Sequence, residues 1–230
     1  SAPPSPPHAD APAIVVRATP ASAPVPEAVP APAAPHPPVP PVTEDDDAAL
    51  DRLPSHLVDV VIALGGNVGP VLDTLRWAVQ RLRAVPGLEV TAVGPLARTA
   101  AVGVTDQPDF LNTVVLARCL LPPRELLHRL RAVEQEAGRE RHERWGPRTL
   151  DLDLIVYGTL AVVTDELELP HPRAHERAFV LQPWAAVDPG AVLPGLGGGP
   201  VAALAATAPD VAGLSWVPGD WLAPDGSQAP

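Results

Sequence analysis

Prolines divide this chain into two parts that fold by different rules. Residues 1–43 hold 15 of the 33 prolines in the sequence, mixed with Ala, Val and Ser and with almost no charge. Proline fixes φ and removes a backbone donor, so no helix or strand is expected at this density. We predict that residues 1–56 form a disordered Pro/Ala-rich tether. Its acidic end, 44–47, is interpreted as a solvated linker, with an acidic docking patch as the alternative.

The remaining sequence has the length of one folded domain. We predict this domain at 57–212 and a loosely ordered tail at 213–230. The chain starts at Ser1 and contains no Met, which favours a piece of a longer product in which the tether joins two domains. No apolar stretch reaches membrane-spanning length and no signal-peptide pattern is present at the start. A cytoplasmic protein without a membrane partner is therefore expected.

The charge pattern indicates a small anionic ligand rather than a nucleic acid. The net charge is −11, and residues 57–230 contain 14 Arg and 20 acidic residues. This balance argues against a general nucleic-acid binder. All basic residues of the chain other than His are Arg, and four fall within ten residues: Arg139, Arg141, Arg144 and Arg148.

Hydrophobic periodicity predicts the element order βαββαβ, which is the split βαβ arrangement. The predicted strands are 58–64, 88–98, 111–120 and 150–157. Each helix begins at a proline, Pro70 or Pro122, and has one apolar face. We therefore predict an α+β fold in which two helices cover one face of an antiparallel sheet. A hairpin at 158–159 and a shorter segment at 172–187 would extend it.

Two aspartates near the end of this pattern predict a metal site. Asp151 and Asp153 are two residues apart, so on a strand they point to the same face. Mg²⁺ is typically held by one or two carboxylates together with substrate phosphates. The alternative is a strand with Asp on its solvated face, but neighbouring like charges usually need a cation to offset them.

An arginine-rich loop leads directly into the aspartates. Arg144 and Arg148 flank a Trp-Gly-Pro bend, and guanidinium groups bind phosphate oxygens through forked donors. An ordinary salt-bridged turn is the alternative. Trp145 is predicted either to pack or to stack on a planar heterocycle, and Gly138 would permit the loop to move as a lid. Because the chain has no P-loop motif, this loop and the aspartates are the predicted polyphosphate site.

A second group of residues indicates a pocket for a molecule with amide-like edges. Residues 106–112 form a turn that delivers Phe110 and Asn112 to the head of a strand. A buried amide needs hydrogen-bonding partners, and a ligand would provide them. Burial in the core is the alternative for Phe110. His171 is structural or functional, and Arg177 and Phe179 form a further basic and aromatic pair.

Several motifs of this chain, in the same order, resemble those of a known family. The stretch 144–154 resembles the motif of 6-hydroxymethyl-7,8-dihydropterin pyrophosphokinase, and the resemblance covers about 58–200, with matching motifs at 63–67, 98–99, 106–112, 138–139 and 169–171. It implies a ferredoxin-like fold in the folate pathway. It also implies transfer of the terminal pyrophosphate of ATP to the pterin hydroxymethyl group, release of AMP, and a pair of Mg²⁺ ions. The reaction would run mainly by positioning and metal charge.

The resemblance also implies roles for individual residues. The metal ligands would be Asp151 and Asp153. The phosphate-binding and closing residues would be Arg139, Arg141, Trp145 and Arg148. ATP would also contact His171, Arg177 and, more weakly, Glu134. The pterin pocket would contain Thr99, Phe110, Asn112, Trp145 and Phe179. The loop after Gly138 is one residue shorter than the commonest form, and Glu166 and Glu168 would add negative charge near the nucleotide.

Two other classes of function compete with this enzyme. A ferredoxin-like binding or regulatory module would keep Phe110 and Asn112 but would need neither aspartate. Single-stranded RNA binding on an open sheet conflicts with the acidic balance and the scarcity of aromatic residues. An upstream folate-pathway domain, joined through the tether, is a further expected partner.

Overall fold

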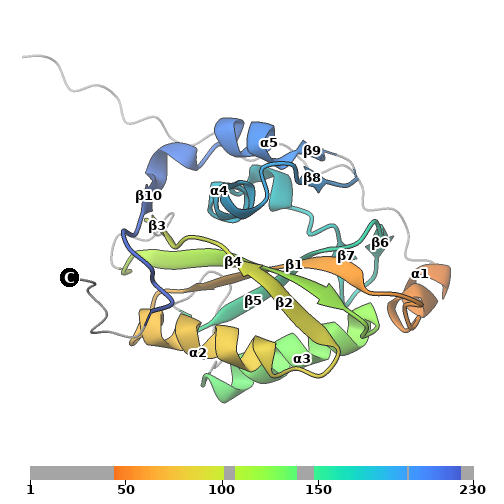
Figure 1. Cartoon of the computed structure of the whole chain (residues 1–230). Helices are drawn as coiled ribbons and strands as arrows, with labels where there is room; N and C mark the ends of the chain where they lie inside the picture. Colours follow the sequence, from red (N-terminus) through yellow and green to blue (C-terminus); the bar gives the residue numbers. More distant parts are fainter. Residues whose placement is uncertain (1–43, 101–106, 139–147, 196, 224–230) are drawn as a thin grey trace, which may run out of the picture. The chain divides into compact units, whose positions relative to one another are not determined.

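The domain is built on an antiparallel sheet whose strand order is β10-β3-β4-β1-β5, with β2 paired to β4 beside this path. The computed structural model describes residues 44–100, 107–138, 148–195 and 197–223, which belong to the compact unit Val39–Pro230 (Figure 1). The strands of the sheet are β1 (Val58–Gly66), β2 (Leu88–Val93), β3 (Ala97–Thr99), β4 (Phe110–Cys119), β5 (Asp151–Tyr157) and β10 (Leu214–Trp216). The predicted α+β fold with a βαββαβ core is confirmed.

One predicted strand, 88–98, is two strands in the structure. β2 pairs with the C-terminal half of β4, whereas β3 pairs with its N-terminal end. The break falls at Gly94, whose N–H donates to the Val114 carbonyl and whose own carbonyl accepts from the Thr113 hydroxyl at 2.9 Å. A Cβ at Gly94 would lie 3.1 Å from Pro183. Close packing at this glycine therefore sets the break.

The helices predicted from periodicity lie together on one face of the sheet. They are α2 (Val71–Arg83) and α3 (Pro123–Glu136), drawn beneath the strands in Figure 1. Their buried leucines and valines recur at helical spacing and join the core cluster that contains Val60, Ile62 and Leu64 of β1. Burial of this stripe stabilises both helices more than their intrinsic propensity does.

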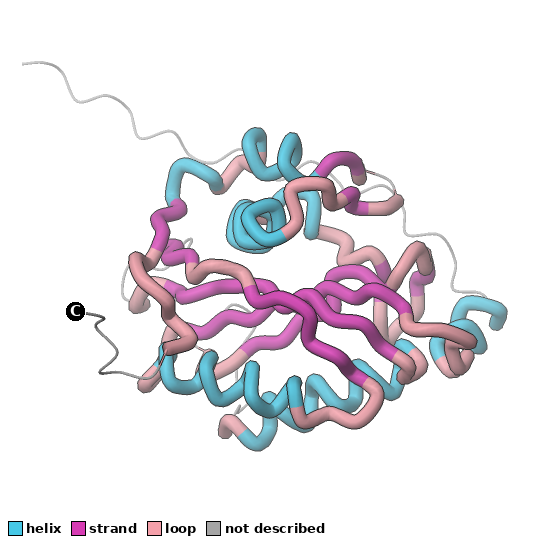
Figure 2. The backbone as a smooth tube through the Cα atoms, viewed as in Figure 1, coloured by secondary structure: helices cyan, strands magenta, loops and turns pink. Residues whose placement is uncertain are grey.

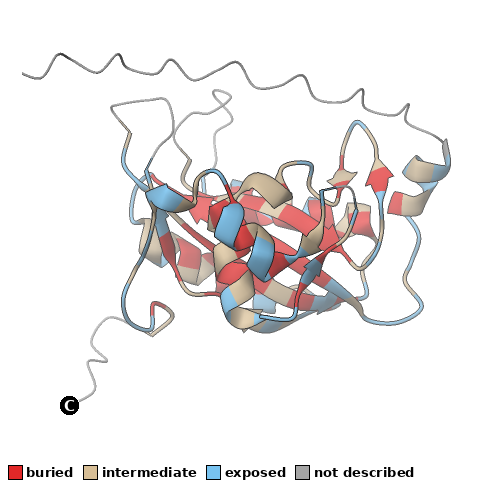
Figure 3. Cartoon of the chain, turned by 90° about the horizontal axis from the view of Figure 1, so that it is seen from above, coloured by how far each residue is buried: buried red, intermediate tan, exposed pale blue. Residues whose placement is uncertain are grey.

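A second helical layer covers the opposite face, where only a short extension was predicted. It contains α4 (Ala178–Val187) and α5 (Val201–Thr207), with the sheet lying between helices on both sides in Figure 2. Side chains of α4, including Leu181 and Trp184, pack with Val61 and Val114 of the sheet. Seen from this side in Figure 3, exposed residues lie on the outer helix above a buried layer. β1 is therefore buried on both faces, which explains its continuous apolar run.

Short elements connect these layers. They are the hairpin β6 (Val162–Val163) and β7 (Glu168–Leu169), the pair β8 (Val192–Leu193) and β9 (Gly199–Pro200), and the 3₁₀ turns Ala174–Glu176 and Val211–Gly213. A hairpin was predicted around 158–159 as an extension of the sheet, but the observed hairpin lies at 162–169 and forms a separate two-stranded sheet. None of the helices in the described ranges is long and apolar enough to cross a membrane.

The acidic run, interpreted above as a solvated linker, is a helix that packs on the domain. The helix α1 (Glu44–Leu50) places Leu50 in the core at 0% exposure. Arg124 of α3 contacts both Asp47, at 2.7 Å, and Asp51, at 2.9 Å. The packed domain thus begins before residue 57, because an arginine far along the sequence meets the acidic side chains.

We expect Leu50→Ala to lower the free energy of unfolding by about 2–4 kcal/mol, because it removes a fully buried leucine and leaves a cavity. Leu53→Ala is the matched control, since Leu53 is 71% exposed; it should change stability by less than about 0.5 kcal/mol. Urea denaturation of the whole chain measures both. Equal stability of the two variants would show that α1 contributes nothing to the folded unit.

The C-terminal segment, predicted to be loosely ordered, is packed as far as it is described. β10 pairs with β3, and Trp221 is buried in the same core cluster as α2 and α3. The Trp221 indole N–H donates to the Gly94 carbonyl at 2.9 Å, and the Trp221 carbonyl accepts from Arg76 Nε at 2.7 Å. The segment therefore passes from the sheet edge into the α2–α3 layer.

Candidate active site

The two aspartates lie at the start of β5, on the sheet face that α4 covers elsewhere. Leu152 and Leu154, which alternate with them, point into the core beneath α2 and α3. Because successive side chains of a strand point to opposite faces, burial of these leucines forces Asp151 and Asp153 to share the other face. Both aspartates are partly exposed.

Two arginines and a histidine already lie beside the carboxylates. Arg148, at the entrance to β5, forms an ion pair with Asp151. The Arg177 guanidinium lies 3.3 Å from Asp153 Oδ2, and His171 Nε2 lies 3.9 Å from the same oxygen. Three further predicted site residues therefore lie beside the two aspartates. The charge of the aspartates is partly offset before any ligand is considered.

His171 is held as a neutral ring. Its pKa is lowered to about 4, first by burial and then by the positive charges of Arg177 and Arg173, while Asp151 opposes them. The Arg173 backbone N–H donates to His171 Nδ1 at 3.2 Å. In the neutral ring the proton is then assigned to Nε2, the nitrogen nearest Asp153. Burial also lowers the pKa of Arg177, against the effect of Asp153.

The sheet register brings the second predicted group beside the aspartates. Asp151 pairs with Gly65 of β1, and Gly65 pairs with Asn112 of β4. Directly paired residues point to the same face, so Asp151 and Asn112 flank a glycine in one row across three strands. A Cβ at Gly65 would lie 2.6 Å from Asn112 Oδ1. The missing side chain is therefore what admits the Asn112 amide.

Asn112 is buried and oriented by β3. Its Nδ2 donates to Thr99 Oγ1 at 3.0 Å. Thr99 in turn pairs with Phe110, which is half-buried at the start of β4. Three of the predicted pterin-pocket residues thus come together at adjacent strand ends. Of the other two, Trp145 is not among the described residues, and Phe179 lies in the first turn of α4, where its ring is 5.5 Å from the Arg177 guanidinium carbon.

Glu134 lies behind the strand rather than on the ligand face. It is 3% exposed, and its Oε1 accepts the backbone N–H of Leu152 at 2.7 Å. It therefore holds β5, an edge strand, between the two aspartates. The sequence does contain a signal for its burial: Glu134 is an acidic residue that follows Leu127 and Leu130 at helical spacing on the core face of α3.

Asn67 is a site residue to which the sequence had assigned no role. It is 2% exposed, and its Oδ1 accepts the Arg148 backbone N–H at 2.9 Å. Its Nδ2 contacts Gln107 Oε1 at 3.3 Å and the Pro108 carbonyl at 3.2 Å. One side chain thus joins the segment before the aspartates to the segment before Phe110. Its sequence signal was an asparagine directly after the buried strand β1.

Glu166, which was expected near the nucleotide, lies against α3. Glu166 contacts Arg124, His128 and Arg131 of α3. Burial would raise the pKa of Glu166, but hydrogen bonds from these three residues lower it overall. Its charge is therefore offset by α3, which removes the reason to expect it to repel a nucleotide. Arg139, Arg141 and Trp145 lie outside the described residues.

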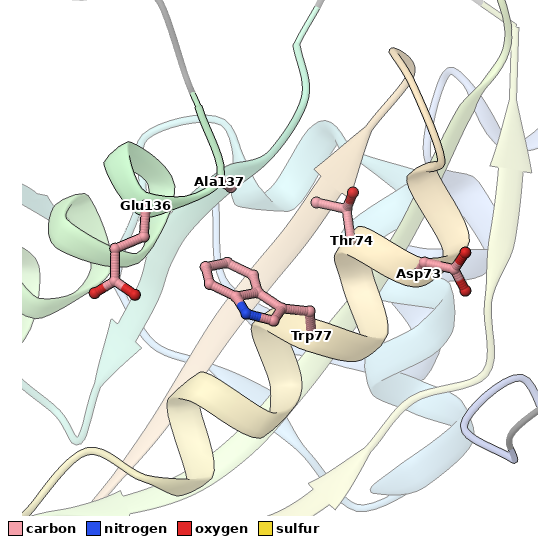
Figure 4. A pocket seen from close by; sticks show the side chains of 5 residues that line it. All are labelled: Asp73, Thr74, Trp77, Glu136 and Ala137. Carbon is pink, nitrogen blue, oxygen red and sulfur yellow. The ribbon is translucent and has the colours of Figure 1, made fainter.

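A shallow hollow of about 270 Å³ lies on the other side of the sheet, between α2 and α3 (Figure 4). It is lined by Asp73, Thr74, Trp77, Glu136 and Ala137. None of the predicted site residues is among them. The hollow is therefore separate from the aspartate face.

The chain is similar to one family of known proteins. The family model for 7,8-dihydro-6-hydroxymethylpterin-pyrophosphokinase matches residues 61–189. The 2-amino-4-hydroxy-6-hydroxymethyldihydropteridine pyrophosphokinase of Synechocystis is 47% identical over 136 residues, which are 59% of this chain and 69% of that protein. The Bacillus subtilis protein of the same name is 44% identical over 126 residues, 55% of this chain and 75% of that protein.

Longer proteins also match over the same region. The mitochondrial folate synthesis bifunctional protein of Arabidopsis thaliana is 46% identical over 125 residues, 54% of this chain but 22% of that protein. Among solved structures, wild-type HPPK-DHPS of Plasmodium falciparum has a TM-score of 0.53 at 10% identity, covering 69% of this chain and 45% of that one. At this identity the structural match supports the fold alone, and the chain spans less than half of the solved protein.

Proposed function

The chain belongs to the 7,8-dihydro-6-hydroxymethylpterin-pyrophosphokinase family, and from this we propose that it transfers the terminal pyrophosphate of ATP to the hydroxymethyl group of 6-hydroxymethyl-7,8-dihydropterin. AMP is the second product, and the reaction serves folate biosynthesis. The observation that carries the proposal is the row Asp151–Gly65–Asn112. This row supports the proposal because Asp151, near the phosphates, and Asn112, at the edge of the pterin, would act from one face of the sheet. Transfer between two bound substrates requires such an arrangement.

The residues on this face fit magnesium together with a nucleotide. No group of three or more His, Cys, Asp or Glu side chains is placed to hold a metal within the described ranges. Two carboxylates alone suit Mg²⁺ that is also bound by phosphate oxygens, which is its usual mode. Asp151 and Asp153 would be the protein ligands. When bound, Mg²⁺ would neutralise phosphate charge and orient the chain of phosphates for in-line attack.

The arginines near the aspartates would bind the phosphates of ATP. Arg148 and Arg177 now contact the carboxylates, so a cation at the aspartates would leave their guanidinium groups to bind phosphate oxygens. His171, with its neutral ring, would donate one hydrogen bond. We include Arg139 and Arg141 on the family motif. For Glu134 we propose an indirect contribution to nucleotide binding, through the position of β5, because its carboxylate is buried against Leu152.

The acceptor pocket would bind the pterin by stacking and by hydrogen bonds at its edge. Phe110 and Phe179 would stack on the flat ring, with Trp145 closing over the ligands. Asn112, held by Thr99, would pair with the amide edge. The acceptor oxygen then attacks the β-phosphorus of ATP, the bond from that phosphorus to the α,β-bridging oxygen breaks, and AMP leaves with that oxygen. The hydroxyl proton passes to solvent.

The direct test is formation of AMP from ATP in the presence of the hydroxymethyl dihydropterin and Mg²⁺. We expect AMP and the pterin diphosphate in equal amounts, and loss of both when EDTA removes the metal. Intact, folded protein that releases no AMP above background contradicts the proposal. Binding of pterin without turnover would instead favour the binding-module hypothesis.

We expect Asn112→Ala to raise the KM for the pterin by about ten- to a hundredfold, because a buried group that pairs with the ligand edge is worth about 1–3 kcal/mol. The KM for ATP should stay within about twofold, since Asn112 pairs with β3 and not with the phosphate-binding arginines. Steady-state kinetics with each substrate varied in turn measures both constants. An equal rise in both would contradict the assignment of Asn112 to the pterin.

For the N-terminal residues we propose a tether to another folate-pathway domain. The support is the proline-rich composition of residues 1–43 and the existence of bifunctional relatives such as that of Arabidopsis thaliana. The packed unit would begin at α1 and end after Trp221. The coding sequence upstream of Ser1 tests the tether: another folate-pathway domain in frame supports it, and a stop codon or an unrelated domain contradicts it.

A further inference from the structure

The C-terminal segment 214–222 lies beyond residue 189, where the match to the family model ends. It nevertheless contacts the strand that orients the proposed acceptor pocket. β10 pairs residue by residue with β3: Leu214 with Thr99, Ser215 with Arg98, and Trp216 with Ala97. β3 has only three residues and would otherwise be an edge strand beside the pocket. Short edge strands with few contacts are the parts of a sheet that open first.

Two hydrogen bonds fasten this segment to the residues before β3. The Val217 backbone N–H donates to the Leu96 carbonyl at 2.8 Å. The Trp221 indole N–H donates to the Gly94 carbonyl at 2.9 Å, which also accepts from the Thr113 hydroxyl at 2.9 Å. Gly94 and Leu96 are thus held from the C-terminal side at the point where the chain leaves β2 and enters β3.

The other end of β3 holds the pocket. Thr99 Oγ1 accepts from Asn112 Nδ2 at 3.0 Å, so the position of Thr99 decides the direction of the Asn112 amide. Thr99 also pairs with Phe110. A small displacement of β3 would therefore turn the Asn112 amide away from the edge of the pterin. The aspartates on β5 are separated from β3 by β4 and β1.

We propose that Trp221 is a positioning residue for the acceptor pocket, acting through Gly94, β3 and Thr99 on the Asn112 amide. The inference rests on the proposed function, because it assigns the pocket to the pterin. It separates the two substrates: the C-terminal segment supports pterin binding, whereas ATP would be bound by β5 and by His171 and Arg177, which precede α4. Trp221 itself is buried in the core and does not touch either substrate.

The test compares Trp221→Phe and Trp221→Ala in the whole chain. Trp221→Phe keeps an aromatic ring in the core but removes the indole N–H. We expect it to raise the pterin KM about fivefold, the factor for one buried hydrogen bond, and Trp221→Ala to raise it further. The ATP KM should remain within about twofold. Trp77→Phe is the matched control, because Trp77 packs against the same core cluster from α2 and should change neither constant.

The outcomes separate the inference from the function. Wild-type protein that releases no AMP contradicts the proposed function. Active wild-type protein with an unchanged pterin KM in Trp221→Phe, or with both KM values raised equally, overturns the positioning role, whatever happens to the melting temperature. Calorimetric binding of the pterin to both Trp221 variants below their melting temperatures gives a second measurement: weaker pterin binding supports the role, and wild-type affinity overturns it.

Discussion

Asp153→Asn should lower kcat by about a hundred- to a thousandfold while leaving the protein folded. The amide has the shape of the carboxylate but lacks its charge, so a metal ligand is lost and the positive charge of Arg177 loses a nearby counter-charge. Loss of one group that stabilises transition-state charge commonly costs two to three orders of magnitude, and about 3–4 kcal/mol. The side chain of Asp153 is 36% exposed, so the lost ion pair should cost less than about 1 kcal/mol of stability.

The measurement is AMP formation at saturating ATP and pterin over a range of Mg²⁺, with Mn²⁺ binding followed by electron paramagnetic resonance in the presence of ATP. Asp165→Asn is the control, because Asp165 is an exposed aspartate in the β6–β7 hairpin. It should match the wild type in both measurements. Turnover of Asp153→Asn within tenfold of the wild type, with unchanged metal dependence, would refute the metal role.

Gly66→Ala should have the second largest effect, on stability and turnover together. A Cβ at this residue would lie 2.6 Å from the Thr149 carbonyl oxygen and 3.4 Å from that of Arg148. Both are backbone atoms, and Asn67 fastens residue 148 through hydrogen bonds at 2.9 Å. Neither side can move alone, so we expect a loss of about 3 kcal/mol in the free energy of unfolding. Displacement of the entrance to β5 should also lower kcat about a hundredfold.

Gly213→Ala provides a control with the same chemical change. A Cβ at Gly213 would have nothing within 4 Å, and this glycine is not in the left-handed region. Its stability should change by less than about 0.5 kcal/mol. Urea denaturation measures the stability of the two variants, and steady-state kinetics measures their kcat. A wild-type denaturation midpoint for Gly66→Ala would mean that β1 and residue 149 are not held together in solution.

The elements with a regular pattern could be predicted from sequence, whereas those defined by distant contacts could not. α2 and α3 carry one apolar stripe each, so their periodicity was visible locally. α4 is apolar on most sides because it is buried between the sheet and α5, which leaves little periodic signal. The acidic helix α1 and the C-terminal Trp221 are packed through Arg124 and Gly94. These partners lie 77 and 127 residues away in sequence.

The site divides in the same way. The sequence alone predicted that Asp151 and Asp153 share one face, because side-chain direction on a strand alternates with a period of two. It also marked Asn112 as a polar residue in an apolar strand. The contacts of three other residues could not be predicted, because each depends on a partner that only folding brings close. Asn67 bonds to residue 148, Glu134 to Leu152, and Glu166 to α3.

What the sequence by itself determined is the identity of the reactive groups, their local spacing and the βαββαβ order that displays them. Only the tertiary structure decided which groups meet. Sheet register places Asp151 and Asn112 on either side of Gly65, although 39 residues separate the aspartate from the asparagine along the chain. Register is set by burial of both faces of β1 and by side-chain contacts across strands. These are long-range packing energies that no local pattern records.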